Sequence, residues 1–320
     1  MAGELQLEAQ AFDNQIVERV QNGHIPDLRR TEKCEYFYNN VWRHPEYVKL
    51  SFVEQFERIS DTIKKYVRKG EIRVLEVGCG PGYLSLELAR AGMNVVGLDI
   101  STKAIEVAVK LAESDPWKEE RGQLEYLVGD FFTEDKLREK SFDAIVFLGA
   151  LHHFKNQDEV MRRASELLNE NGLMLAHEPT RDRVTPGNAA ILHLIKLLLS
   201  SSQGFYAEQP IPNGMEEYST QLESLYKTMK YEDDHGQKVQ SINDNEAGYK
   251  EMYAALTGHY NELVLEDRSA FYTEIIGGLR FDEQKNIALA KFIKDADIKL
   301  RELGILQATE FFFAGRKKES

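Results

Sequence analysis

Short apolar runs alternate with amphipathic stretches through the middle of the chain. The apolar runs predict buried strands, because strands are short and a covered sheet needs apolar side chains on both faces. These runs cover residues 72–77, 94–98, 124–128, 142–148 and 173–176. Strands that alternate with helices are typical of a mostly parallel sheet with right-handed crossovers. The pattern therefore predicts an α/β fold with helices on both faces.

Helices are predicted between these strands. One covers residues 83–91 and ends at Gly92, a residue suited to the left-handed conformation that closes many helices. The next begins after Ser101, whose side chain can cap its first turn. A third has an apolar stripe at helical spacing and is expected to end near Gly172.

The two ends of the chain follow a different pattern. Residues 10–68 are expected to be helical, and residues 189–199 to form a further apolar helix. Residues 201–250 are polar and rich in Gly, Pro, Asn and Asp, which indicates an insertion. A final amphipathic helix stops at Gly304 and precedes a late strand at residues 310–314.

Composition narrows the class of protein. The chain has 320 residues, and 40 Lys and Arg stand against 53 Asp and Glu, so the net charge is −13. This acidity argues against a nucleic-acid partner, which usually requires a basic surface. Two cysteines cannot form a disulfide framework, and the longest apolar stretch is shorter than the roughly 20 residues of a membrane span. We expect a cytoplasmic protein without a membrane span.

A glycine-rich turn follows the first predicted strand. Gly78, Gly80 and Gly82 lie in the sequence Glu-Val-Gly-Cys-Gly-Pro-Gly at residues 76–82. Such a turn needs glycine because the backbone bends sharply and a ligand approaches it closely. The third glycine comes one residue earlier than in the dinucleotide fingerprint, and no P-loop pattern occurs here. The turn therefore favours a nucleoside without a pyrophosphate over NAD or FAD.

Acidic residues stand where the predicted strands end. Asp99 ends the second strand, where this architecture places the acid that binds ribose hydroxyls. Asp130 follows the third strand and can accept a hydrogen bond from an exocyclic amine. Glu76, Gly149 and Glu178 fall on the same edge, because the carboxyl ends of parallel strands meet there.

Four motifs in this order resemble those of the class I S-adenosylmethionine-dependent methyltransferases. They are E-V-G-C-G-P-G, L-D-I-S, G-D-F and F-D-A-I-V-F-L-G-A-L-H-H-F, and the resemblance covers about residues 70–180. It implies a Rossmann-like sheet of seven strands, whose antiparallel last strand would come from residues 310–316. It also implies S-adenosylmethionine as the cofactor and S-adenosylhomocysteine as the product.

The resemblance assigns roles to single positions. Gly78, Gly80 and Gly82 would pass under the amino-acid part of the cofactor, and Glu76 would set the loop. Asp99 would hold the ribose with Ile100 beside it, while Asp130 and Phe131 would hold the adenine. Gly149 would border the methionine.

Candidates for catalysis and substrate binding are less specific. His152, His153 and Glu178 follow the fourth and fifth strands, and one of them could act as a general base or only shape the pocket. No metal is expected, because no ligand spacing supports one. Four residues near the N-terminus could either bind substrate or pack as an ordinary helix face: Tyr36, Tyr38, Trp42 and Arg43.

These observations divide the chain into four segments. They are a helical N-terminal lid at 1–69, a cofactor-binding core at 70–180, a substrate-side cap inserted after the fifth strand at 181–281, and a C-terminal helix and last strand at 282–320. The expected function is in-line methyl transfer to a small-molecule acceptor, with a homodimer as one possible assembly. Two alternatives stay open: a protein or peptide methyltransferase, and a cofactor-binding protein that transfers no methyl group.

Overall fold

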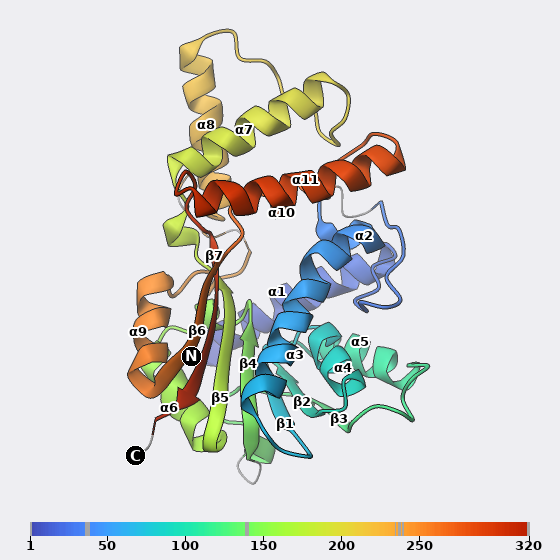
Figure 1. Ribbon diagram of the computed structural model, residues 1–320, viewed down its shortest axis with the longest axis vertical. Helices are drawn as coiled ribbons and strands as arrows, with labels where there is room; N and C mark the ends of the chain where they lie inside the picture. Colours follow the sequence, from blue (N-terminus) through green and yellow to red (C-terminus); the bar gives the residue numbers. More distant parts are fainter. Residues whose placement is uncertain are drawn as a thin grey trace.

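A seven-stranded sheet forms the centre of the protein in a computed structural model, which describes residues 2–35, 39–137, 141–233, 235, 238 and 240–318 (Figure 1). The strands lie in the order β3-β2-β1-β4-β5-β7-β6. β7 is antiparallel to both of its neighbours, and the other pairs are parallel. The strands are β1 (Arg73–Val77), β2 (Asn94–Asp99), β3 (Leu124–Val128), β4 (Phe142–Leu148), β5 (Leu168–Pro179), β6 (Tyr260–Arg268) and β7 (Glu310–Lys317). This sheet confirms the predicted Rossmann-like fold with an antiparallel late strand.

Helices cover both faces of the sheet, because its strands are apolar on both sides. The helices α3 (Glu54–Tyr66) and α4 (Tyr83–Arg90) pack on one face, and α6 (Gln157–Leu167) and α9 (Tyr249–His259) on the other. The alternation along β7 shows how one strand serves both layers: Phe311 and Phe313 join the core under α6, and Phe312 joins the core under α3.

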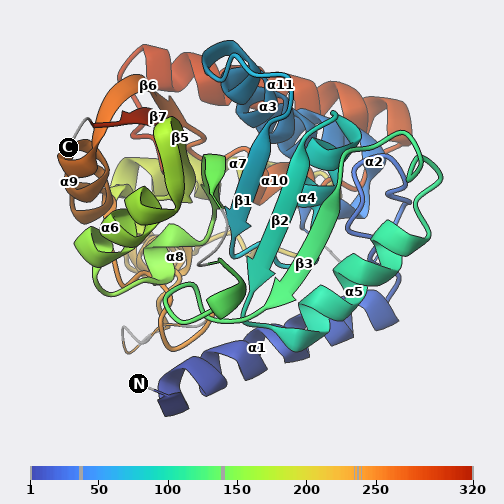
Figure 2. The ribbon, with the colours of Figure 1, turned by 90° about the horizontal axis from the view of Figure 1, so that it is seen from below.

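The lid precedes the sheet and includes a long first helix, α1 (Ala2–Gln21), which lies alongside α5 (Thr102–Glu113) (Figure 2). Short turns follow: η1 (Val41–Arg43), α2 (Pro45–Val48) and η2 (Lys49–Val53). The described residues between Asn22 and Asn40 are not helical, so the prediction of helices throughout residues 10–68 is wrong there.

A buried ion-pair network anchors this non-helical part of the lid. Arg90 of α4 lies 2.9 Å from both Asp27 and Asp115, and all three side chains are at most 1% exposed. Arg30 pairs with Asp27 as well, at 2.6 Å. Because a buried charge without its partner is costly, the network fixes the chain where secondary structure does not.

Helices of the segment predicted as a cap stand at the carboxyl ends of the strands (Figure 1). Its helices α7 (Pro186–Ser201), α8 (Met215–Met229) and α10 (Thr273–Ile276) share an apolar core with α11 (Glu283–Glu302) and with parts of the lid. None of the described helices is long and apolar enough to cross a membrane.

Two features of the sheet differ from the sequence expectation. α6 ends at Leu167 rather than near Gly172, because residue Leu168 already pairs with β4 and Asn171 takes the left-handed turn. β6 lies inside the segment expected to form the cap. Its sequence, YNELVLEDR, is charged and half-exposed, as suits the edge of a sheet, so it lacks the apolar run that marks a buried strand.

Candidate functional site

The glycine-rich turn between β1 and α4 has the backbone that the sequence predicts. Gly78, Gly80 and Gly82 have φ angles of 73°, 50° and 80°, which lie in the left-handed region. A Cβ atom at Gly78 would lie 2.5 Å from the Cβ of Ala150, and one at Gly82 would lie 2.4 Å from the hydroxyl of Tyr126. At Gly80 a Cβ would meet open space, so this part of the loop is free to face a ligand.

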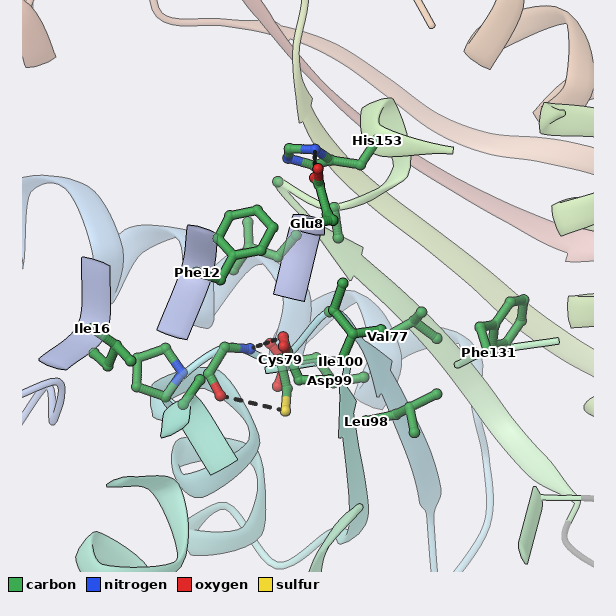
Figure 3. Close-up of a pocket in the computed structure, with 18 of the residues that line it drawn as sticks. Glu8, Phe12, Ile16, Val77, Cys79, Leu98, Asp99, Ile100, Phe131 and His153 are labelled. Carbon is green, nitrogen blue, oxygen red and sulfur yellow. Dashed lines mark hydrogen bonds and ion pairs between the residues drawn. The ribbon is translucent and has the colours of Figure 1, made fainter. Parts of the chain in front are cut away.

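A cavity of about 380 Å³ opens beside this turn at the carboxyl ends of the strands (Figure 3). We call it the donor cavity. All but one of the predicted cofactor residues line it: Glu76, Gly78, Gly80, Asp99, Ile100, Asp130, Phe131 and Gly149. Gly82 is the exception, because it turns the chain into α4 and packs against Tyr126.

Asp99 is tied to the turn by its carboxylate. Oδ2 accepts a hydrogen bond from the backbone N–H of Gly80 at 2.7 Å, and Oδ1 accepts one from Ser101 at 2.8 Å. Burial raises the pKa of Asp99 against the effect of these two bonds. Each oxygen keeps a further lone pair, so the carboxylate can still accept from two neighbouring hydroxyl groups.

Glu76 lies under the turn and is almost fully buried. Its Oε2 accepts a short hydrogen bond from the hydroxyl of Ser85. Burial raises the pKa of Glu76 to about 8. At neutral pH the carboxyl group is therefore largely protonated and can donate a hydrogen bond, which an ionised glutamate cannot.

The far wall of the donor cavity carries Asp130 and Phe131. Oδ1 of Asp130 accepts a hydrogen bond from the backbone N–H of Phe132 at 3.0 Å, and the other oxygen is left for a donor in the cavity. Phe131 is buried and meets Phe147 edge to face, with 5.9 Å between ring centroids. A carboxylate beside an apolar ring suits a flat heterocycle with an amino group.

The three candidates for catalysis lie at different depths. His153 lines the donor cavity, and Figure 3 shows its ring beside Glu8, with 3.0 Å between Nδ1 and Oε1. Glu178 is fully buried behind the cavity, where it accepts hydrogen bonds at 3.0 Å from the backbone N–H groups of Ala150 and Leu151. Nδ1 of His152 lies 2.8 Å from the same carboxylate. Glu178 and His152 thus fix the turn η4 (Leu151–His153) that presents His153.

Glu8 is a site residue that the sequence analysis missed. It is 3% exposed, and its carboxylate accepts hydrogen bonds from the Ser241 hydroxyl at 2.7 Å and the Asn243 N–H at 3.1 Å. Burial opposes its ionisation, but these bonds and His153 outweigh burial and lower the pKa of Glu8. Its helical spacing from Leu5, Phe12 and Ile16, which also line the donor cavity, is the signal that could have found it.

A group of three side chains beside the donor cavity could hold a metal ion. Ligand atoms of His152, His153 and Asp244 lie within 4.8 Å of one another. Nε2 of His152 is 3.6 Å from Oδ1 of Asp244. Burial disfavours the charged imidazole, but Asp244 and Glu178 outweigh burial and raise the pKa of His152. A raised pKa favours a proton at this ring, and a metal ion would have to displace it.

Trp42 and Arg43, two of the residues expected to bind substrate, lie away from the donor cavity. Trp42 is buried and stacks on Phe52, with 4.6 Å between ring centroids, and it meets Tyr83 at 5.2 Å. Arg43 is buried and pairs with Glu35 at 3.1 Å. Neither lines the donor cavity, but Tyr83 does, so Trp42 supports its wall. Tyr36 and Tyr38 lie outside the described residues.

Comparison with known proteins agrees with this geometry. Residues 68–247 match a family model described as a methyltransferase domain. The chain is 34% identical over 130 residues to the ubiquinone biosynthesis O-methyltransferase of Pelagibacter ubique (strain HTCC1062), and the match covers 40% of this chain and 49% of that protein. The chain thus spans about half the length of the curated relatives it matches.

Solved structures share the fold. A magnesium protoporphyrin IX methyltransferase from Synechocystis PCC 6803 with bound SAH has a TM-score of 0.53 at 11% identity, covering 98% of this chain and 100% of that one. The 4+2 cyclase SpnF has a TM-score of 0.52 at 14% identity, covering 99% and 97%. At such identities the likeness shows the fold alone. Because the family model matches more than half of the chain, the predicted family is confirmed, and this protein belongs to the class I S-adenosylmethionine-dependent methyltransferases.

Proposed function

We propose that this protein transfers the methyl group of S-adenosylmethionine to a small-molecule acceptor. The observation that carries the proposal is the donor cavity, in which the glycine turn, Asp99 and Asp130 face one space at the carboxyl ends of the strands. Asp99 accepts from the ribose hydroxyls and Asp130 from the adenine amine. Gly78 and Gly80 let the methionine part approach the backbone.

The rate of this reaction depends mainly on the alignment of the reacting atoms. The acceptor's nucleophile forms a bond to the methyl carbon while the carbon–sulfur bond breaks, and the electron pair of that bond stays on sulfur in S-adenosylhomocysteine. The positive charge of the sulfonium already activates the methyl group, so the protein contributes mainly by holding nucleophile, carbon and sulfur in line. No nucleophilic side chain is required for such a step.

In this proposal His153 takes a proton from the acceptor where the acceptor must lose one. It lines the donor cavity, and Glu8 holds its ring. Glu178 and His152 are positioning residues in this proposal, because they are buried behind the cavity and hold the turn that carries His153.

Enclosure of the site favours a small acceptor over a protein or peptide. Glu8 of the lid bonds to Ser241 and Asn243 of the cap, so the two additions meet over the donor cavity. Gln15 of the lid also reaches the backbone oxygen of Gln240, at 3.3 Å. A polypeptide would need these contacts to open, whereas a small molecule does not.

The proposal is tested with purified protein, labelled S-adenosylmethionine, small-metabolite pools and a peptide library. We expect label in a low-mass product. Label only in peptides would favour the peptide methyltransferase instead, and binding of the cofactor without transfer to any acceptor would contradict methyl transfer altogether. An Asp99→Ala variant is assayed in parallel. Its rate of methyl transfer should fall with its affinity for the cofactor, whereas transfer by a contaminating enzyme would not change.

A further inference from the structure

A second cavity of about 250 Å³ lies where the core, the lid and the cap meet. Arg181, which follows β5 in the turn η5 (Arg181–Arg183), and Glu310 at the start of β7 line it from the ends of two strands of the sheet. Lid residues such as Phe52 and cap residues such as Tyr231 and Glu274 line its other sides. We call this cavity the second chamber.

The second chamber lies next to the donor cavity. Tyr83 lines the donor cavity, and Phe52 lines the second chamber. Their rings meet edge to face, with 5.4 Å between centroids. Burial raises the pKa of Tyr83, and Glu76 on one side and Glu310 on the other raise it further. The two cavities therefore approach each other at this pair of aromatic rings.

Arg181 brings a positive charge to the second chamber, where the Glu310 carboxylate interacts with it through space. Its guanidinium lies 4.0 Å from the centre of the Tyr231 ring, and within the described parts of the chain no carboxylate pairs with it. Glu310 faces the same chamber, but Nε2 of His177 lies 3.2 Å from its carboxylate. A half-buried guanidinium without a carboxylate partner is suited to bind an anionic group of a ligand.

Tyr231, whose ring lies against Arg181, has a strained backbone conformation. Tyr231 has a φ angle of 57° at the end of α8, where the N–H of Glu232 bonds to the oxygen of Lys227 at 3.1 Å. Helix ends of this kind usually carry glycine, because other residues are strained there. Strain of this sort is concentrated at ligand sites.

Two further hydrogen-bond acceptors line the second chamber. The carboxylate of Glu274 makes no hydrogen bond or ion pair to the described residues, and Oε1 of Gln55 is buried without a partner. Both can accept from a hydroxyl or ammonium group. Arg181 and Glu274 thus offer the chamber one positive and one negative group that do not pair with each other.

We propose that the second chamber binds the methyl acceptor, and that this acceptor is a small molecule with a carboxylate for Arg181 and a hydroxyl or amine donor for Glu274. The inference rests on the proposed function, because it makes the chamber the acceptor side of the same site. The chamber's volume is at the low end for ligand pockets, which fits an acceptor smaller than a drug-sized molecule.

The test uses pairs of probes that match in shape and differ in charge. Protein loaded with S-adenosylhomocysteine is titrated by calorimetry with 3-hydroxybenzoate and 3-aminobenzoate, and with the corresponding amides. We expect each acid to bind at least about tenfold more tightly than its amide, because a charge-assisted pair is stronger than a neutral hydrogen bond. Arg181→Gln should remove this preference, and Arg181→Lys should keep part of it.

Arg183→Gln is the matched control. Its guanidinium pairs with Asp267 at 2.7 Å and does not line the second chamber, so the preference for acids should persist in this variant. Thermal unfolding confirms that each variant is folded. Failure of the acids to bind, equal binding of acids and amides, or an unchanged preference in Arg181→Gln would overturn the inference.

The labelled-transfer assay separates this inference from the proposed function. Acid binding that depends on Arg181 without methyl transfer to any acceptor would contradict the proposed function and leave an anion-binding chamber. Methyl transfer to uncharged acceptors at a rate that Arg181→Gln does not change would contradict the inference and leave the proposed function standing.

Discussion

Asp99→Ala is the single substitution that tests most directly whether the donor cavity binds S-adenosylmethionine. The carboxylate accepts from the N–H groups of Gly80 and Ser101, and the remaining lone pairs face the cavity. A hydrogen bond to a charged group contributes about 1.5–3 kcal/mol. Loss of the ribose contact alone should therefore weaken S-adenosylmethionine binding roughly 10- to 150-fold.

Two further variants separate this effect from damage to the turn. Asp99→Asn keeps the shape and one acceptor, and we expect a smaller loss of affinity. Asp13→Asn is the matched control, because Asp13 caps α5 through Ser101 at 2.6 Å and Lys103 at 2.9 Å but does not line the donor cavity. Calorimetry with S-adenosylmethionine measures all three variants. An affinity in Asp99→Ala equal to that of the unaltered protein, or an equal loss in Asp13→Asn, would refute the ribose assignment.

Three other predictions follow from the contacts of the turn, the network and the lid. Gly82→Ala should destabilise the protein by more than Gly92→Ala in urea unfolding. Both positions have positive φ angles, which cost an L-residue about 1–2 kcal/mol, but only a Cβ at Gly82 collides with Tyr126. Hydrogen bonds from Arg90 and Arg30 outweigh burial and lower the pKa of Asp27 to about 2. A carboxyl group whose pKa is lower in the folded than in the unfolded protein stabilises the fold at pH values above the unfolded pKa near 4. The free energy of unfolding should therefore fall by roughly 2 kcal/mol as the pH decreases from about 4 to 2. An Asp27→Asn variant should lack this part of the pH dependence. Glu8→Ala should speed hydrogen exchange at residues 240–244, whereas Glu4→Ala should not, because Glu4 is exposed and meets Lys155 at the surface. Equal protection in both variants would show that Glu8 does not hold the cap.

The sequence was sufficient for the central sheet. Apolar runs mark these strands, so β3 and β4 have the predicted bounds and β1 and β2 differ by one residue, whereas β5 extends beyond the predicted residues 173–176 at both ends. The edge strand β6 was not predicted, because one of its faces is solvated and its sequence therefore lacks a continuous apolar run. The residues that hold the nucleoside were also predictable, since the carboxyl ends of parallel strands bring Asp99 and Asp130 to one edge whatever the rest of the chain does.

Contacts between the additions and the core were not predictable. Glu8 and Ser241 are far apart in the sequence, and only the packing of α1 across the cavity brings them to 2.7 Å. Likewise His152, His153 and Glu178 look alike as polar residues after apolar strands. Which of them faces the cavity depends on the turn η4, whose backbone N–H groups need the Glu178 carboxylate beneath them.

The central claim is that the donor cavity holds S-adenosylmethionine, and a crystal structure of the protein with S-adenosylhomocysteine tests it most directly. We predict that both ribose hydroxyls lie within hydrogen-bond distance of the Asp99 carboxylate, with the adenine amine near Asp130 and the methionine part over Gly80. A ligand bound outside this cavity, or in it with the ribose away from Asp99, would contradict the account.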